Sequence, residues 1–184
     1  MSIVLVGSTS GSVTLQEPAV AGTTVLTLPA VTGTVLTTTS PKAGNVLQVV
    51  NSTYSTQAST SSGTFQDTGL SATITPSSSS SKILVIWAIN GVYSGTGTGV
   101  ETNLVRTSTQ IVYTENLAAR EGTGSTDAGS GTSGGTYLDS PATTSATTYK
   151  CQFRSRNGSS SVTVQFTGGG GASTSMMTLM EIAG

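Results

Sequence analysis

The run KILVIWAIN, residues 82–90, constrains the fold of this chain more than any other segment. Seven of its nine residues are apolar, and it contains the only tryptophan, Trp87. Successive side chains of a strand point to opposite faces of its sheet, so a nearly continuous apolar run places apolar groups on both faces. We therefore predict that residues 82–90 form a central strand whose two faces are both covered.

Two further segments alternate between apolar and polar residues, which is typical of strands with one buried face. Residues 149–154 read YKCQFR and residues 161–166 read SVTVQF. Between them, Asn157 and Gly158 tolerate the positive φ of a tight turn, so we predict a β-hairpin. The predicted core comprises Ile83, Val85, Trp87, Tyr149, Cys151, Phe153, Val162, Val164 and Phe166.

The body of the chain, residues 46–184, is rich in Thr, Val and Ile, which favour strands, and is punctuated by Gly, Pro and Ser. Only residues 115–121 (ENLAARE) have a helix-forming composition. Further strand signals lie at residues 46–50, at 64–75 with a turn at 67–69, and at 175–182. About eight to ten strands predict an all-β fold, an antiparallel β-sandwich or jelly-roll-like knob.

Residues 1–45 differ from the body. Short β-prone runs recur there, and GTTVLTL at 22–28 is echoed by GTVLTT at 33–38. A segment this thin, without aromatic residues, cannot bury enough apolar surface by itself to offset its ordering entropy. We therefore predict an extended, β-rich N-terminal arm, rather than a flexible tail, that docks on a neighbouring subunit or shell. The predicted attachment residues are Val4, Leu5, Val13, Leu15, Val25, Leu26, Leu28, Val35 and Leu36.

Ionic side chains are scarce. Charged residues make up 8% of the chain, the net charge is −1, and the seven Lys and Arg residues are not clustered, which argues against nucleic-acid binding. Low net charge gives little self-repulsion and favours assembly into a larger particle. The single cysteine permits no intrachain disulfide and fits assembly in a reducing cytoplasm. We expect no signal peptide, because the first residues lack a positively charged region. We expect no membrane helix, because no segment approaches roughly 18 consecutive apolar residues.

The chain contains no histidine, which removes the usual general base and the commonest metal ligand. Ser133 lies in GTSGG, residues 131–135, which we interpret as a loop rich in Gly and Ser. The segment matches G-x-S-x-G, but the histidine partner and the following helix of a nucleophile elbow are missing. The glycine-rich residues 95–99 and 168–171 precede no helix and are interpreted as loop tips. We expect no catalytic residues, no cofactor and no metal.

Three other motifs have ordinary explanations. The carboxylates around the long loop lack D-x-D spacing, so a calcium site among them is not favoured; they are Glu101, Glu115, Glu121, Asp127 and Asp139. The glycosylation patterns at Asn51 and Asn157 are expected by chance in a chain rich in Ser and Thr. Cys151 shares a strand face with Tyr149 and Phe153, so we expect a buried, inert thiol.

Several segments of the sequence resemble a known class of proteins. The segment SGSVTLQEPAVAGTTVLTLPAVTGTVLTTTS is similar to the repetitive segment near the N-termini of tailed-phage fibre and capsid-associated proteins. The pieces FQDTGLSATITPSSSSSKILV and YLDSPATTSATTYKCQF and the closing SMMTLMEIAG resemble small phage domains that form trimeric β-sandwich knobs. The resemblance implies a virion protein, assembled in the host cytoplasm, with an attachment arm at 1–45 and a homotrimeric knob at 46–184.

Three functions are compatible with these features. The first is a capsid decoration or cement protein that binds the major capsid protein and stabilises the assembled shell. The second is a short head or tail fibre whose knob binds a host-surface glycan or protein, with Tyr93, Tyr113 and Tyr137 available in distal loops for stacking on sugars. The third, a polysaccharide-degrading fibre enzyme, needs paired carboxylates in a groove, for which a chain so poor in acidic residues offers little.

Overall fold

The computed structural model describes residues 3–6, 9–15, 19–20, 42–117, 129–168, 170–171 and 173–184. Every regular element within these ranges is a β-strand, which confirms the all-β prediction. None of the described residues forms a helix long and apolar enough to cross a membrane. The chain divides into two compact units, residues 1–35 and residues 36–184.

The first unit contains a short antiparallel hairpin. Strand β1 (Ile3–Val6) pairs with β2 (Ser12–Leu15) in the register Ile3↔Leu15. Gly11, directly before β2, has φ +81°, a conformation that glycine adopts at little cost. The arm that we predict over residues 1–45 stays a prediction, because residues 21–41 lie outside the described ranges.

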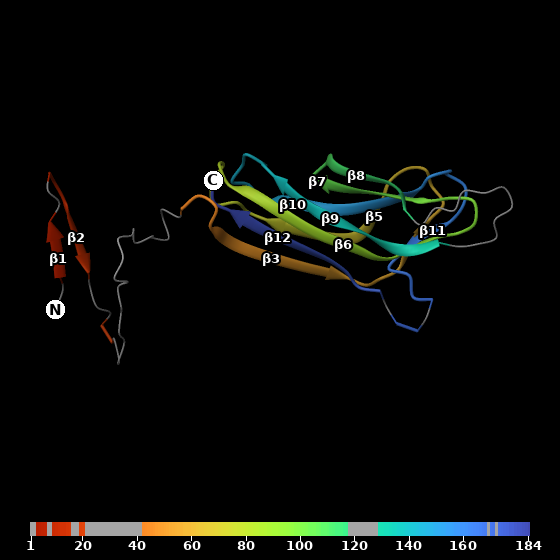
Figure 1. The fold of residues 1–184 in the computed structure, drawn as a ribbon, viewed down its shortest axis with the longest axis horizontal. Helices are drawn as coiled ribbons and strands as arrows, with labels where there is room; N and C mark the ends of the chain where they lie inside the picture. Colours follow the sequence, from red (N-terminus) through yellow and green to blue (C-terminus); the bar gives the residue numbers. More distant parts are fainter. Residues whose placement is uncertain are drawn as a thin grey trace. The chain divides into compact units, whose positions relative to one another are not determined.

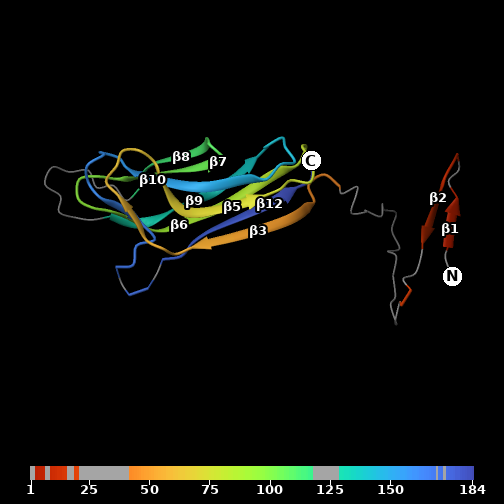
Figure 2. The ribbon, with the colours of Figure 1, turned by 180° about the vertical axis from the view of Figure 1, so that it is seen from behind.

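The second unit is a sandwich of two antiparallel sheets, seen from opposite sides in Figures 1 and 2. The small sheet has the order β5–β10–β7–β8. The large sheet has the order β3–β12–β6–β11–β4, with β9 also paired to β6. The strands of the small sheet are β5 (Gln66–Ile74), β7 (Val100–Arg106), β8 (Thr109–Leu117) and β10 (Thr147–Ser155). Those of the large sheet are β3 (Val46–Tyr54), β4 (Ala58–Thr60), β6 (Lys82–Ser94), β9 (Gly129–Asp139), β11 (Val162–Val164) and β12 (Ser175–Ile182).

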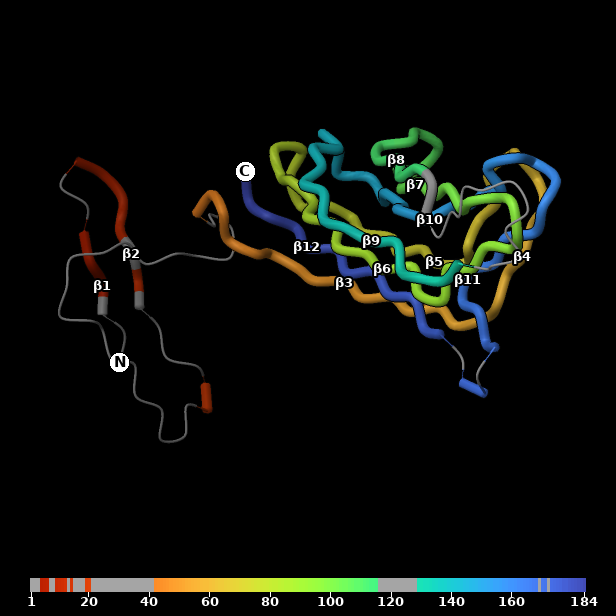
Figure 3. The backbone as a smooth tube through the Cα atoms, turned by 45° about the vertical axis from the view of Figure 1, so that its right-hand side comes forward, coloured from red at the N-terminus to blue at the C-terminus, as the bar shows by residue number. Residues whose placement is uncertain are grey.

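Strand β6 is the centre of the large sheet, as its apolar run predicts. Residues 83–88 pair with β12 along one edge and with β9 along the other. At Asn90 and Gly91 the register shifts, and beyond this point β11 lies beside β6. The backbone N–H groups of Gln165 and Phe166 donate to the carbonyls of Asn90 and Gly91. Figure 3 shows that β11 and β4 lie at the end of the sandwich opposite the C-terminus.

The hydrophobic core lies between the two sheets. It contains eight of the nine core residues expected from the sequence: Ile83, Val85, Trp87, Tyr149, Cys151, Phe153, Val162 and Val164. The burial of β10 alternates residue by residue, as expected for a strand with one face on the core. In β6 the odd-numbered residues from 83 to 89 are buried, whereas the even-numbered ones are only partly covered or exposed.

The structure places Phe166 differently from the prediction. Strand β11 ends at Val164, and Gln165 has φ +51°, so the extended backbone on which the alternation depends is interrupted. The Gln165 side chain is buried, and Phe166 is half-buried with its ring stacked on Tyr93. Periodicity locates core residues only while the backbone stays extended.

The hairpin predicted at Asn157 and Gly158 is wrong. Strand β10 belongs to the small sheet, whereas β11 pairs with β4 and β6 in the large sheet, so the connecting loop crosses between layers. The Asn157 carboxamide shapes this loop, because its Oδ1 accepts hydrogen bonds from the N–H groups of Ser159 and Ser160. Gly158 has the expected positive φ, +67°. A turn signal determines the local bend but not the strands that pair beyond it.

Three other local expectations also differ from the structure. Residues 67–69, predicted as a turn, lie inside β5, where Gly69 has φ +88° beside a register shift in the pairing with β10. Residues 115–117, part of the segment with helix-forming composition, end strand β8, and the rest of that segment lies outside the described ranges. Residues 131–135, expected in a loop, belong to β9. In each segment, pairing with a neighbouring strand overrides the local preference.

Candidate functional site

The large sheet presents an apolar outer face, on the side away from the core. One row across four strands reads Leu138, Leu84, Met180 and Val49, which are register partners in β9, β6, β12 and β3. A single row therefore carries four large apolar side chains. We call the complete set the outer face: Val46, Val49, Leu84, Ile86, Ala88, Leu138, Met176, Met180 and Ile182.

The exposure of these side chains sets the outer face apart from an ordinary protein surface. Val49 is 57% exposed, Leu138 50% and Met176 47%. Single exposed apolar residues need no explanation, but a contiguous apolar patch is typical of an interaction site. The central strand thus has one face in the core, whereas its other face, which its apolar run predicts to be covered, is open within the described part of the protomer.

The outer face also lacks charge. Lys82 is the only charged residue at the outward positions of β3, β6, β9 and β12, and the others that are not apolar include Asn51, Thr136 and Thr178. Strand β3 is the last strand on its side of the sheet order, so one edge of its backbone has no strand partner among the described residues. Its sequence, VLQVVNSTY, contains neither Pro nor Lys, two residues that commonly protect an edge strand from pairing.

The predicted attachment residues lie in the first unit as far as the structure describes them. Val4 and Leu5 in β1 are 54% and 56% exposed. Val13 and Leu15 belong to β2. The remaining five, Val25, Leu26, Leu28, Val35 and Leu36, fall outside the described residues.

Four of the residues weighed for catalysis or metal binding are buried: Ser133, Cys151, Glu101 and Asp139. Ser133 is buried, and its hydroxyl lies 2.8 Å from that of Thr102. Burial raises the pKa of the Cys151 thiol to about 12, so it stays protonated and unreactive. Glu115 lies in β8, while Glu121 and Asp127 are outside the described ranges. Within those ranges, no group of three or more His, Cys, Asp or Glu residues is placed to hold a metal ion.

Asp139 is held by a buried network. The Nη1 of Arg106 lies 2.8 Å from one Asp139 carboxylate oxygen and 2.9 Å from the other, and the Tyr149 hydroxyl donates to the latter at 2.6 Å. Burial raises the pKa of Tyr149, and the neighbouring carboxylate raises it further, so the phenol remains a donor. These contacts tie β7, β9 and β10 together across the sandwich.

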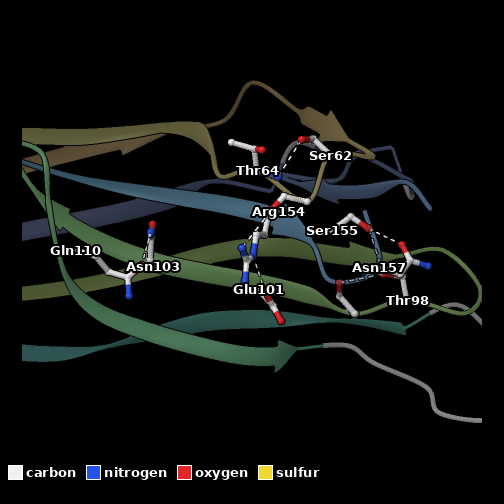
Figure 4. Close-up of polar contacts among 11 residues, drawn as sticks. Ser62, Thr64, Thr98, Glu101, Asn103, Gln110, Arg154, Ser155 and Asn157 are labelled. Carbon is white, nitrogen blue, oxygen red and sulfur yellow. Dashed lines mark hydrogen bonds and ion pairs between the residues drawn. The ribbon is translucent and has the colours of Figure 1, made fainter. Parts of the chain in front are cut away.

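Glu101 has a similar structural role. The Nε of Arg154 donates to Glu101 at 2.6 Å (Figure 4). The Nη1 of Arg154 donates to the carbonyl of Gly63 at 3.2 Å. The Arg154 guanidinium also lies 4.6 Å from the centre of the Phe65 ring, against which Tyr113 packs edge-on. This ion pair therefore fastens the loop before β5 to the small sheet.

A pocket opens beside β6, β9 and the loop after β11. Its volume is about 610 Å³, and its lining includes Tyr93, Phe166, Ser130, Thr132 and Ser173. The rings of Tyr93 and Phe166 are stacked, with centroids 4.5 Å apart and planes inclined by 16°. The three tyrosines expected in distal loops all lie in strands instead: Tyr93 in β6, Tyr113 in β8 and Tyr137 in β9.

The sequence offered part of the signal for these two surfaces. The continuous apolar run of β6 implies that something covers both its faces. The apolar run does not predict which outward residues of β9 and β12 belong to the outer face, because the pairing of these strands with β6 is long-range. The contact between Phe166 and Tyr93 cannot be predicted from the sequence either, because it depends on the irregular backbone at Gln165.

No protein-family model matches the chain, and no curated protein is significantly similar to it. Among solved structures, a chain of infectious bursal disease virus, Gx strain, matches 99% of this chain and 50% of its own length, at 13% identity and a TM-score of 0.34. A chain of the Gt strain of that virus matches 97% of this chain and 46% of its own length, at 14% identity and a TM-score of 0.32. The chain thus spans about half the length of these structures, and TM-scores this low carry no argument about function.

Proposed function

We propose that this chain is a structural protein of a bacteriophage particle, a decoration protein that assembles as a homotrimer and stabilises the capsid shell. The single observation that carries the proposal is the outer face, an apolar and almost uncharged sheet surface that the described part of the protomer leaves open. The homotrimer and the phage particle come from the sequence resemblance. The scarcity of charged residues is consistent with both.

The dimensions of the outer face suit a protein interface. Neighbouring strands lie about 4.8 Å apart, and a strand rises about 3.3 Å per residue. The four strands β3, β6, β9 and β12 therefore have a flat footprint of roughly 600 Å². Side-chain relief adds to this area, and a standard interface buries roughly 800 Å² on each partner. Contact through this surface would bury Val46, Val49, Leu138 and Met176, the most exposed members of the outer face.

The partner that fits the outer face is a second copy of the chain. A surface with one charged residue, Lys82, can meet its own copy with little like-charge repulsion. The open edge of β3 adds backbone donors and acceptors, which a neighbouring strand can satisfy. Both features favour association between identical sheets over binding to a strongly charged partner.

The first unit is proposed to attach the protein to the particle. Two paired strands of four residues are at best marginally stable in water, and Val6 at the end of β1 is 81% exposed. A covering surface on a capsid subunit would bury these side chains. Because binding only to the assembled shell shifts the equilibrium towards assembly, such attachment would stabilise the particle.

The oligomeric state tests the role of the outer face. Sedimentation velocity of the full chain is expected to find a trimer, and Leu138→Lys is expected to shift it towards monomer by placing a charge in the apolar row. Ser71→Lys is the matched control, because Ser71 is exposed on the small sheet. A monomeric unmodified chain, or a trimer that is unaffected by Leu138→Lys, would contradict the proposal.

The particle itself tests the decoration role. Particles that lack this protein are expected to release their genome at a lower temperature than complete particles. A copy number comparable with that of the major capsid protein, measured from stained gels of purified virions, would agree with decoration. Equal resistance to heat and osmotic shock with and without the protein would rule it out.

A short head or tail fibre is the second candidate function. The pocket with the stacked rings of Tyr93 and Phe166 favours it, since a fibre knob binds a receptor at the host surface. A few copies per particle would support the fibre and count against decoration.

We also propose that the protein has no catalytic activity. Two buried carboxylates, Glu101 and Asp139, are each paired with an arginine, and the chain has no histidine. Release of reducing ends from host polysaccharides by the purified protein would contradict this proposal.

A further inference from the structure

The pocket beside Tyr93 has a lining that combines aromatic rings with hydroxyl groups. Tyr93 and Phe166 supply the rings, and Ser130, Thr132 and Ser173 supply hydroxyls. Its volume is about 610 Å³, and much of its boundary is open to solvent. Its mixed lining therefore suits a small organic ligand that is held at the surface and stays partly exposed.

The position of the Phe166 ring is fixed from two sides. One face of the ring stacks on Tyr93 at 4.5 Å, and Gly168 lies so close that a Cβ at this position would collide with Cε1 of Phe166. The backbone N–H of Phe166 is also bonded to the carbonyl of Gly91 at 3.0 Å. The aromatic surface is thus held in place before any ligand arrives, which reduces the entropy cost of binding.

The hydroxyls are held in a similar way. Thr132 donates to Oδ1 of Asn90 at 3.0 Å, and Ser173 donates to the carbonyl of Phe166 at 2.9 Å. A hydroxyl that donates its proton keeps acceptor lone pairs, so both oxygens can still accept a hydrogen bond. Each therefore offers an acceptor beside the aromatic pair.

The charge of the pocket narrows the ligand class. None of the described lining residues is charged, so an anionic ligand would gain no ion pair there. The pocket places aromatic rings next to hydroxyl oxygens that can accept hydrogen bonds. A ligand that has an apolar ring face and many hydroxyl donors fits this arrangement. We propose that this pocket binds a neutral saccharide, with one sugar ring packed against the Tyr93–Phe166 pair and its hydroxyls donating to Thr132 and Ser173. The inference does not depend on the decoration role, and it deepens the second candidate function, because the same pocket is the observation that favours a fibre.

The test uses the full chain with maltotriose, mannotriose, N,N′,N″-triacetylchitotriose and lactose as neutral probes, and 3′-sialyllactose as the anionic probe. Saturation-transfer NMR detects contact of sugar-ring protons with the protein, and titration calorimetry measures the dissociation constant. At least one neutral probe is expected to bind. Tyr93→Ser is expected to weaken it at least tenfold by removing a ring, and Tyr93→Phe is expected to retain binding.

Two further variants keep the test decisive. Gly171 lines the pocket and a Cβ there meets nothing within 4 Å, so Gly171→Leu adds a bulky side chain at the pocket and is expected to weaken binding even if Tyr93→Ser does not fold. Tyr113→Ser is the matched control, because it removes an exposed ring from the small sheet and is expected to leave binding unchanged.

Two results would overturn the inference: absence of saturation transfer to every neutral probe, or binding that neither Tyr93→Ser nor Gly171→Leu weakens. Preferential binding of 3′-sialyllactose would also overturn it, because the pocket offers no cation. Sedimentation of the same samples separates the two proposals. A monomer that binds sugar contradicts only the proposed assembly, and a trimer that binds none contradicts only the saccharide site.

Discussion

Gly69 of β5 packs directly against the aromatic ring of Tyr54 in β3, so this pair joins the edge strands of the two sheets. Gly69 has φ +88°, and a Cβ there would collide with the Tyr54 ring. Two independent constraints, backbone conformation and space, therefore require glycine at this position.

Replacing Gly69 by alanine is expected to lower the free energy of unfolding by about 3 kcal/mol, through left-handed strain and a forced shift of Tyr54. Gly44→Ala is the control, because Gly44 has φ +89° but a Cβ there meets nothing within 4 Å. It is expected to cost only the strain, about 1 kcal/mol. Urea unfolding monitored by Trp87 fluorescence measures the free energy of unfolding of both variants. Equal losses of free energy in the two variants would show that the Tyr54 contact is unimportant.

Replacing Asp139 by asparagine is expected to destabilise the fold by about 3 kcal/mol, because it leaves Arg106 without its carboxylate partner in a largely buried network. Asp67→Asn is the comparison, since Asp67 pairs with Lys150 at 2.9 Å but is 54% exposed. That change is expected to cost less than about 1 kcal/mol. Denaturant titration at neutral pH measures the free energy of unfolding of both variants. A loss for Asp67→Asn as large as that for Asp139→Asn would show that burial is not the controlling factor.

The stability of the protein is expected to fall in acid because of Glu181. Burial alone would raise the pKa of this carboxyl, but hydrogen bonds from Gln48 and Ser77 outweigh burial and lower the pKa to about 2, from a reference value of 4.5. A pKa that is lower in the folded state gives stability above the unfolded value, and this stability is lost as the pH falls from about 5 towards 2.

Glu181→Gln is therefore expected to reduce the loss of unfolding free energy between pH 5 and pH 2 by on the order of 2 kcal/mol. Thermal unfolding across this pH range measures the effect. Glu115→Gln, at an exposed position of β8, is the control. An unchanged pH dependence in Glu181→Gln would refute the assignment.

The Cys151 thiol is expected to resist modification while the protein is folded. It is completely buried, and burial raises its pKa to about 12, so almost none of it is thiolate at neutral pH. Ellman's reagent should react only after denaturation, whereas a cysteine introduced by Ser71→Cys on the exposed surface should react at once in the folded protein. Rapid labelling of Cys151 in native protein would show that the core opens readily.

The amino-acid sequence by itself determined the strand content, the central position of β6 and eight of the nine core residues. Alternation with a period of two depends only on extended backbone, so it can be read within one strand. It is the reason that Tyr149, Cys151 and Phe153 could be assigned to one face before their neighbours were known. The same reasoning misplaced Phe166, because the positive φ of Gln165 leaves no periodic signal.

Only the tertiary structure decided which strands are neighbours, and both candidate surfaces depend on those pairings. The row of Leu138, Leu84 and Met180 unites residues from three strands that are far apart in the chain. Likewise, β11 crosses to the large sheet instead of pairing with β10, and this crossing brings the Phe166 ring onto Tyr93. Local propensity is a property of a few adjacent residues, whereas strand pairing is a competition among all the strands of the chain for buried surface and hydrogen bonds.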